Sequence, residues 1–205
     1  MTEPTVFVVD DDEAVRGGLE QLIQTIGLNV QTHASADEFL ASYRHGQPGC
    51  LVLDIRMPGM GGLDLQEQLA RQGIQLPIIF LTGHGDVPAA VRALKAGAMD
   101  FLEKPFNSQV LLDLIQQAIR RDAETHTRVA EESEVARRLT ALTGREHQVL
   151  EKIIDGKANK VIAMELGISE RTVEFHRSKI MKKMQVRSLA ELVNLVHRPA
   201  LNGDR

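Results

Sequence analysis

Acidic side chains follow two short apolar runs of the chain. Val6–Val9 is followed at once by the three acids Asp10–Asp12, and Leu51–Leu53 is followed by Asp54. If both runs are strands of a parallel sheet, their carboxyl ends lie at the edge where open α/β sheets bind ligands. Carboxylates gathered there repel one another unless a hard cation joins them, and Mg²⁺ takes one or two carboxylates together with phosphate oxygens. The pattern therefore indicates phosphoryl chemistry.

Three further polar groups follow in the same region. The run from Met57 to Gly62 holds a proline and several glycines, which predict a tight loop that can turn the carbonyl of Arg56 toward a metal ion. Thr82 ends the expected fourth strand with a hydroxyl, and Lys104 follows the fifth with an ammonium group. Singly these are ordinary, because Asp after a strand often caps a helix and Thr-Gly often forms a turn. Together, each at a strand end, they favour one polar site.

The elements that would position these groups alternate along the first 120 residues. Short apolar runs predict five strands, at Val6–Val9, Val30–His33, Leu51–Leu53, Ile78–Leu81 and Met99–Leu102. Amphipathic segments between and after them predict helices near 14–26, 35–45, 63–72, 86–96 and 107–120. Strands interleaved with helices indicate a parallel sheet covered on both faces, so the fold class is α/β.

Composition limits the remaining possibilities. A chain of 205 residues can form two small domains or one large one. No apolar stretch approaches the ~18 residues of a transmembrane helix, and the first residues lack a basic segment followed by a long apolar one. The single cysteine, Cys50, excludes a disulfide framework or a cysteine zinc site and is predicted to be a core thiol. We therefore expect a cytoplasmic protein with no membrane segment.

Charge divides the chain into two parts. Residues 1–139 carry 12 Lys and Arg against 20 Asp and Glu, whereas residues 140–205 carry 12 against 8. An acidic front and a basic rear suggest two domains, the rear one being better suited to a polyanion. Between them, 121–139 contains no Gly or Pro and much charge, which predicts a solvated helical linker. Half of its heptad positions are polar or small, which favours an exposed helix extending from the first domain over a coiled coil.

The rear part has four short helical patterns, near 143–155, 159–166, 170–184 and 188–197. Gly167 ends the second and Ser169 caps the third, which is typical of a helix-turn-helix. On the third helix, Val173, Ile180 and Met184 share a face with Arg177 at its margin. The opposite face carries Arg171, Glu174, Phe175, Ser178, Lys179 and Lys182. An exposed Phe175 could pack on a thymine methyl in the major groove, or could dock on the front domain.

The front part resembles the receiver domain of bacterial two-component response regulators. The motifs VVDDD, LDIRMPGM, LTGHGD and FLEKPF occur in that family's order and spacing. The resemblance implies that Asp54 is the phosphoacceptor, which takes its phosphoryl group from a sensor histidine kinase. It also implies that Asp11 and the Arg56 carbonyl hold Mg²⁺, with Asp10 acting through water and Asp12 left as a spare acid.

The same resemblance assigns a switch and a dimer surface. Lys104 would pair with a phosphoryl oxygen, and its bond to Pro105 would be cis. Thr82 would move to bond the phosphoryl group while Phe101, often Tyr in the family, turns inward. The surface altered by this change, on which the family commonly dimerises, would include Val91, Lys95 and Leu112.

The rear part resembles the LuxR-type DNA-binding domain. The patterns LTxRE (142–146), NKxIA (159–163), SxxTV (169–173) and HR (176–177) stand as in that family, where x is a position that carries no resemblance. The resemblance implies that Glu174, Phe175 and Ser178 face base edges, whereas phosphates are contacted by Lys160, Thr172, Arg177, Lys179 and Lys183. The last helix would supply a dimer contact through Leu189, Leu192, Val193 and Val196.

The two resemblances place the chain in the NarL/FixJ group of response regulators. They predict a flavodoxin-like receiver domain at 1–120, a helical linker at 121–139 and a four-helix helix-turn-helix domain at 140–205. The expected function is phosphorylation-dependent promoter binding as a homodimer that acts on RNA polymerase, and not catalysis. Two alternatives stay open, a DNA-binding protein that needs no phosphorylation and a phosphatase. The phosphatase lacks an acid two residues after Asp54, where Arg56 stands.

Overall fold

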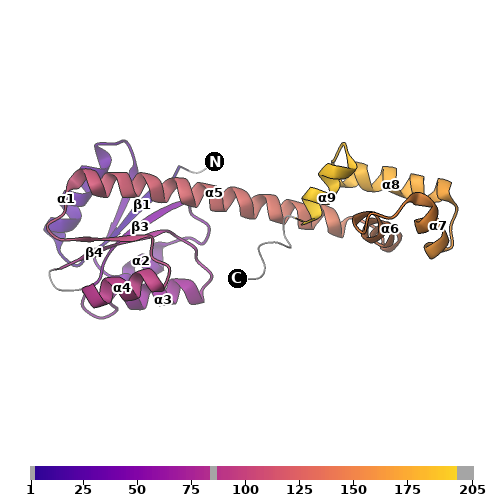
Figure 1. Cartoon of the computed structure of the whole chain (residues 1–205). Helices are drawn as coiled ribbons and strands as arrows, with labels where there is room; N and C mark the ends of the chain where they lie inside the picture. Colours follow the sequence, from indigo (N-terminus) through magenta and orange to yellow (C-terminus); the bar gives the residue numbers. More distant parts are fainter. Residues whose placement is uncertain (1–2, 84–86, 198–205) are drawn as a thin grey trace. The chain divides into compact units, whose positions relative to one another are not determined.

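The computed structural model of the chain describes residues 3–83 and 87–197 (Figure 1). These residues belong to two compact units, Met1–His126 and Thr127–Arg205. The last three residues of the motif LTGHGD (84–86) lie outside the described residues, as do 198–205 at the end of the expected rear domain.

Unit 1 is built on one five-stranded parallel sheet in the order β2-β1-β3-β4-β5. Its strands are β1 (Thr5–Val9), β2 (Asn29–His33), β3 (Gly49–Asp54), β4 (Ile78–Thr82) and β5 (Asp100–Glu103). All five were predicted from the apolar runs, with ends that differ by one or two residues. The strand order reverses between β1 and β3, so the carboxyl ends of these neighbours flank the switch point at which such folds bind ligands. The predicted flavodoxin-like α/β fold is confirmed.

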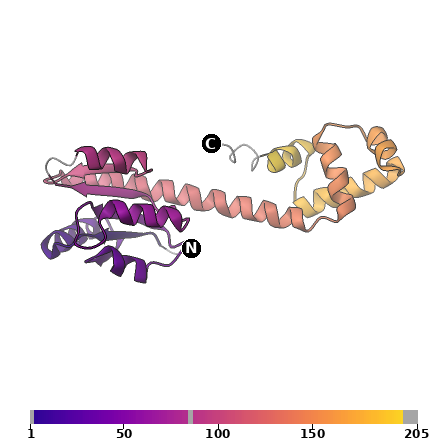
Figure 2. The same cartoon turned by 90° about the horizontal axis from the view of Figure 1, so that it is seen from below.

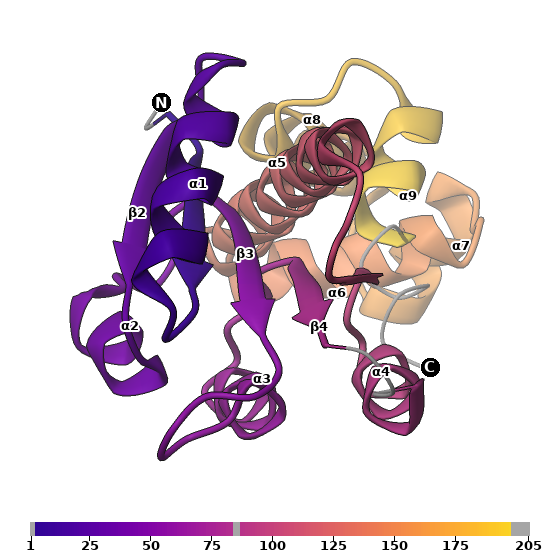
Figure 3. The ribbon, with the colours of Figure 1, turned by 90° about the vertical axis from the view of Figure 1, so that its left-hand side faces the viewer.

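Helices cover both faces of this sheet. They are α1 (Glu13–Gln24), α2 (Ala36–Ser42), α3 (Gly62–Arg71), α4 (Val87–Lys95) and α5 (Ser108–Thr140). Figure 3 shows α1 and α5 on one side of the sheet and α3 and α4 on the other, and Figure 2 shows α3 and α4 side by side. Each helix therefore closes one of two apolar cores.

The two cores follow from the alternation of side chains along the strands. Phe7 and Val9 point into the core beneath α2, α3 and α4, together with Phe39, Leu65 and other apolar residues. Val6 and Val8 point into the core beneath α1 and α5. β1, β3 and β4 are buried on both faces, and such strands read as continuous apolar runs, which is why the sequence marked these three clearly.

The fifth helix continues through the linker. One continuous helix runs from Ser108 to Thr140, which confirms the prediction of an exposed helix that extends from the first domain. Nothing in the segment breaks a helix, and it is held on the sheet by Leu111, Ile115 and Ala118. Its first part belongs to unit 1 and its part from Thr127 onward to unit 2.

The described part of unit 2 contains the end of α5 and four short helices. The four helices were predicted from the sequence. These are α6 (Gly144–Ile154), α7 (Asn159–Leu166), α8 (Glu170–Met184) and α9 (Leu189–His197). Val149, Ile162, Val173 and Ile180 lie at the centre of its core. Val135 and Leu139 of α5 pack into the same core, so the last turns of the linker are part of this unit.

Two residues assigned to dimer surfaces are buried within their own units. Leu112 is 7% exposed in the core beneath α5, and Leu192 is 1% exposed in the core of unit 2. Both are apolar residues whose helical phase matches the core face, so neither can form a contact between protomers. Among the helices of the described residues, none is long and apolar enough to cross a membrane.

Candidate functional site

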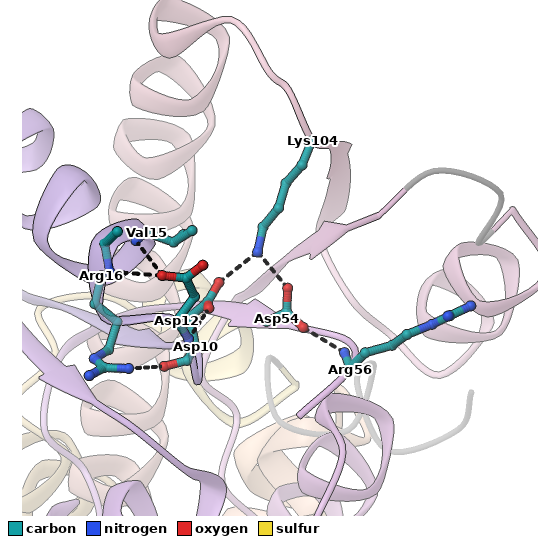
Figure 4. A network of polar contacts seen from close by, with 8 residues as sticks. Asp10, Asp12, Val15, Arg16, Asp54, Arg56 and Lys104 are labelled. Carbon is teal, nitrogen blue, oxygen red and sulfur yellow. Dashed lines mark hydrogen bonds and ion pairs between the residues drawn. The ribbon is translucent and has the colours of Figure 1, made fainter. Parts of the chain in front are cut away.

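The ends of three strands bring two carboxylates and one ammonium group together (Figure 4). Asp54 is the last residue of β3, Asp10 follows β1 directly, and Lys104 follows β5. Nζ of Lys104 lies 2.7 Å from Oδ2 of Asp10 and 2.6 Å from Oδ1 of Asp54, bridging the two acids. The groups that the sequence placed at one sheet edge therefore meet in space.

Backbone groups hold the other oxygens of both carboxylates. The N–H of Asp12 donates to Oδ1 of Asp10 at 2.9 Å, and the N–H of Arg56 donates to Oδ2 of Asp54 at 2.6 Å. Asp12 itself caps α1 by accepting from the N–H groups of residues 14 and 15, which agrees with the expectation of a spare acid at the helix start. Arg16 of α1, which was not predicted to take part in the site, donates to the carbonyl of Asp10 at 2.7 Å.

Burial and the ion pairs act on these groups in opposite directions. Burial raises the pKa of Asp54, and the bonds from Lys104 offset only part of that shift. Burial alone would lower the pKa of Lys104, but its bonds to Asp10 and Asp54 outweigh burial and raise the pKa. The ammonium group therefore stays charged and partly neutralises the acids at any working pH.

The loop after Asp54 is held tightly against β3. The N–H of Gly62 donates to the carbonyl of Ile55 at 3.0 Å, and Gly59 adopts a left-handed conformation with φ 76°. A Cβ atom built on Gly62 would lie 2.2 Å from the carbonyl oxygen of Asp54, so only glycine fits there. The expected tight loop is present, and its glycine allows α3 to begin beside the phosphoacceptor candidate.

Thr82 and Phe101 lie on the two neighbouring strands. Thr82 is the last residue of β4 and is 3% exposed, and its carbonyl accepts from the N–H of Lys104 at 2.8 Å. Phe101 on β5 is half-buried and packs against the core beneath α4. The peptide bond between Lys104 and Pro105 is cis, as the resemblance implied.

The carboxylates of the site suit a hard divalent cation, although the ammonium group of Lys104 lies between Asp10 and Asp54. Among residues 3–83 and 87–197, no three His, Cys, Asp or Glu side chains are gathered closely enough to hold a metal ion. Asp10 and Asp54 are instead bridged by Lys104, and Asp11 beside them is exposed. The carboxylates of Asp10 and Asp54 are still oxygen ligands of the kind that Mg²⁺ prefers.

The third helix of the rear unit exposes the predicted polar face. Gly167 ends α7 in the left-handed conformation, and Oγ of Ser169 caps α8 by accepting from the N–H of Thr172 at 3.1 Å. The residues expected opposite the core are all exposed, namely Arg171, Glu174, Phe175, Ser178, Lys179 and Lys182. Lys160 on α7 is exposed as well, whereas Thr172 and Arg177 are half-buried.

Phe175 is 58% exposed and is the one aromatic residue among the exposed large apolar side chains of the described residues. Nζ of Lys179 lies 5.4 Å from the centre of its ring, and the ring of His176 packs against its edge. The aromatic group is therefore held at the surface beside a cation.

Lys183, which was expected to contact a phosphate, makes two bonds within unit 2. Its Nζ donates to Oε2 of Glu146 at 2.6 Å and to the carbonyl of Ala141 at 3.0 Å. Glu146 is also the third residue of a capping box with Thr143 at the start of α6. The structure therefore shows this lysine held by a buried carboxylate, and its contact with a phosphate stays a prediction. The Thr-x-x-Glu spacing could have revealed the box but not the lysine bound to it.

Two family models together match most of the chain. Residues 6–116 match the response regulator receiver domain, and residues 140–196 match the luxR family of bacterial regulatory proteins. The first match includes every residue of the acidic site, and the second includes all of α8.

Several regulatory proteins are similar to this chain over both its front and its rear parts. The chain is 45% identical over 193 residues to the response regulator protein TodT of Pseudomonas putida, covering 94% of this chain and 85% of that protein. It is 47% identical over 190 residues to the transcriptional regulatory protein FixJ of Azorhizobium caulinodans, covering 93% and 90%. The solved structure of response regulator StyR aligns with a TM-score of 0.89 at 52% identity, covering 96% of this chain and 100% of that one. The chain therefore belongs to the family of DNA-binding response regulators, which join a receiver domain to a luxR-type domain and regulate transcription in response to phosphorylation.

Proposed function

We propose that Asp54 accepts the phosphoryl group from the phosphohistidine of a sensor histidine kinase. The observation that carries this assignment is the ammonium group of Lys104, which lies 2.6 Å from Oδ1 of Asp54. Phosphoryl transfer needs aligned groups and charge neutralisation more than covalent help from the protein. Lys104 can pair with an oxygen of the new acyl phosphate, because its charge already lies beside the carboxylate that becomes phosphorylated.

Mg²⁺ is the cofactor that suits this site. Its ligands would be Asp11, Asp54 and the backbone carbonyl of Arg56, with Asp10 acting through water. When bound, the ion would neutralise charge on the phosphoryl oxygens. Because Lys104 bridges Asp10 and Asp54 in the structure, it would share or release one carboxylate as the ion binds.

The change at Asp54 would reach the surface through β4 and β5. Thr82 ends the strand that pairs with Asp54 through Leu81, and Phe101 lies on the next strand. We infer that the Thr82 hydroxyl turns toward the phosphoryl group and that Phe101 packs further inward. The exposed residues Val91 and Lys95 of α4 would then present a homodimer surface.

The rear unit would bind a promoter through α8. Glu174, Phe175 and Ser178 would face base edges, with Phe175 against a thymine methyl. The basic residues around them, and Thr172, would contact phosphates and set affinity, namely Lys160, Arg171, Arg177, Lys179 and Lys182. On α9, Leu189 is 44% exposed, and with the half-buried Val193 and Val196 it would join two such units on a near-palindromic site.

The assembled protein would regulate transcription, with activation through RNA polymerase as the expected outcome. It would act in the cytoplasm and would not turn over a substrate. For the domain limits we retain 1–120 and 140–205, joined by the linker at 121–139, which lies entirely within α5.

The decisive experiment is phosphorylation with acetyl phosphate and Mg²⁺, followed by intact mass and size-exclusion light scattering. The wild type should gain one phosphoryl group and dimerise, whereas Asp54→Asn should do neither. Asp12→Asn is the matched control, because that acid caps α1 and should not affect uptake. Uptake by the Asp54→Asn variant would contradict the assignment. Uptake without dimerisation would leave the phosphoacceptor in place and contradict the proposed switch.

The role of Phe175 needs a separate test. A duplex is first enriched from a random pool by the phosphorylated wild type. Phe175→Ala should bind that duplex more weakly, because truncation removes the contact with the groove. Met164→Ala is a suitable control, since Met164 on α7 is 78% exposed and was given no role. Equal binding by the Phe175→Ala variant and the wild type would contradict a base contact.

A further inference from the structure

The C-terminal end of α8 is tied to the end of α5 by one arginine. Nη1 of Arg138 donates to the carbonyl of Met184, the last residue of α8, at 3.0 Å. The last carbonyls of a helix have no partner within the helix, and a cation beside them is favourable. The backbone N–H groups of Gln185 and Val186 bond two other carbonyls of this turn. Arg138 therefore satisfies a carbonyl that the helix itself leaves open.

Arg138 is itself held in place from its other side. Its Nε donates to Oε1 of Glu134 at 2.8 Å, and its side chain is 21% exposed. The guanidinium groups of Arg137 and Arg138 lower the pKa of Glu134 to about 2, so this acid is ionised at any working pH. Glu134 thus fixes the guanidinium that reaches α8.

Apolar packing supports the same junction. Val135 and Leu139, one on each side of Arg138 in sequence, pack in the core that contains Ile180 and Met184 of α8. Lys183 makes a second polar link, from α8 back to the turn between α5 and α6. The end of α8 is therefore anchored, whereas the face from Arg171 to Lys179 is exposed.

We propose that Arg138 is a positioning residue for DNA recognition, which fixes the C-terminal end of α8 to the last turns of α5 without touching DNA. The proposal rests on the proposed role of α8 in DNA binding. It makes 134–140 a working part of the DNA-binding unit, although this segment lies outside the luxR-family match at 140–196 except for its last residue. DNA contacts need fixed geometry, so loosening this anchor should weaken them.

The chain supplies a matched control for this proposal. Arg137 precedes Arg138 and donates two bonds to the same Glu134, but its side chain is 73% exposed and turned to solvent. Arg137→Gln and Arg138→Gln remove the same charge from the same helix. Arg138→Lys keeps a cation that can reach one acceptor and should restore part of the function.

The test compares these variants as full-length proteins, with equal helix content checked by circular dichroism. Amide hydrogen exchange of residues 181–186 measures how firmly the C-terminal end of α8 is held. Affinity for the duplex enriched by the wild type measures whether DNA binding depends on that anchor. Arg138→Gln should exchange faster in this turn, on the order of tenfold, and bind about threefold to tenfold more weakly. The slope of log affinity against log salt should not change, because no phosphate contact is lost. Arg137→Gln should resemble the wild type.

Other outcomes would overturn the proposal in distinct ways. A salt slope lowered by about 1 would identify Arg138 as a direct phosphate contact. If Arg138→Gln exchanges faster but binds DNA equally well, the anchor is purely structural. If Arg137→Gln and Arg138→Gln have equal effects, the effect comes from the lost charge and not from the bond to α8. If the wild type enriches no duplex, the proposed DNA binding fails, while the exchange comparison still decides whether Arg138 holds α8.

Discussion

Asp122 of α5 provides a test of how that helix is attached to unit 1. Its side chain is 3% exposed, and its Oδ2 accepts from the N–H of Gly49, the first residue of β3, at 2.9 Å. Gly49 cannot be replaced, because a Cβ atom there would lie 1.8 Å from the carbonyl oxygen of Thr5. The start of the strand that ends in Asp54 is therefore pressed against β1 and bonded to α5.

Asp122→Ala should destabilise unit 1 by about 1–3 kcal/mol, since it leaves the buried N–H of Gly49 without an acceptor. Asp122→Asn keeps an oxygen acceptor and removes a buried charge, so its free energy of unfolding at pH 7 should equal or exceed that of the wild type. The two variants thus separate the hydrogen bond from the charge.

Urea unfolding followed by tyrosine fluorescence measures this effect in the correct unit. The chain has no Trp and one Tyr, Tyr43, which lies in unit 1 and packs against the rings of Phe7 and Phe39. Its signal therefore reports unfolding of the sheet domain and not of unit 2. A loss below about 0.5 kcal/mol in Asp122→Ala, or equal losses in both variants, would refute the reasoning.

The pH dependence of the same comparison has a defined sign. Burial raises the pKa of Asp122 above its ordinary value of 3.8, and the bond from Gly49 and the nearby His126 offset only part of that shift. A carboxyl group with a raised pKa in the folded state stabilises most below its unfolded pKa, and this contribution is lost as pH rises through the folded pKa. The wild type should therefore lose stability relative to Asp122→Asn as pH rises above about 4. A His126→Gln background removes the titration of the imidazole, whose Nε2 lies 3.5 Å from Asp122.

Three further changes test the acidic site and the rear unit. Gly62→Ala should destabilise unit 1 by about 1–3 kcal/mol in the same urea assay, because its Cβ atom would clash with the carbonyl of Asp54. The control Gly17→Ala has open space around its Cβ atom and should be neutral or stabilising. Lys104→Met should tighten Mg²⁺ binding in calorimetry, because no ammonium group then competes with the ion for Asp10 and Asp54. The same change should slow phosphoryl uptake. Weaker Mg²⁺ binding would contradict competition between the ammonium group and the ion. Glu146→Gln keeps the capping box and loses a charged partner, so unit 2 should lose about 1–2 kcal/mol in a circular-dichroism melt, and an unchanged melt would contradict a stabilising pair.

The three central strands, β1, β3 and β4, could be predicted from sequence because they are buried on both faces, whereas the edge strands β2 and β5 are partly exposed. Residues such as Val6 and Phe7 enter different cores, and yet both must be apolar, which produces an uninterrupted run. The continuity of α5 could also be predicted, because the charged segment 121–139 contains no Gly or Pro. The place where α5 passes from one unit to the other could not, since Val135 packs in the core of the second unit without any signal in the charged residues before it.

The residues of the acidic site could also be predicted, but their pairing could not. Sequence placed Asp10, Asp54 and Lys104 at strand ends, whereas the bridge between them depends on the direction of each side chain. Apolar periodicity has a similar limit, since it marks Leu112 and Leu192 equally well as core or as interface. Only the packing of the folded chain assigns them to the core.

The charges of the acidic site explain why phosphorylation would require a further cation. One ammonium group lies between Asp10 and Asp54, so the bridged pair retains about one negative charge, and exposed Asp11 adds another. A phosphoryl group adds about two negative charges while the carboxylate it joins loses its own as an acyl phosphate, which leaves the site more negative than before. Lys104 is already fully engaged and cannot offset this increase alone. A divalent ion would offset it, so phosphoryl uptake should depend on Mg²⁺ even though the folded site is stable with Lys104 in its centre.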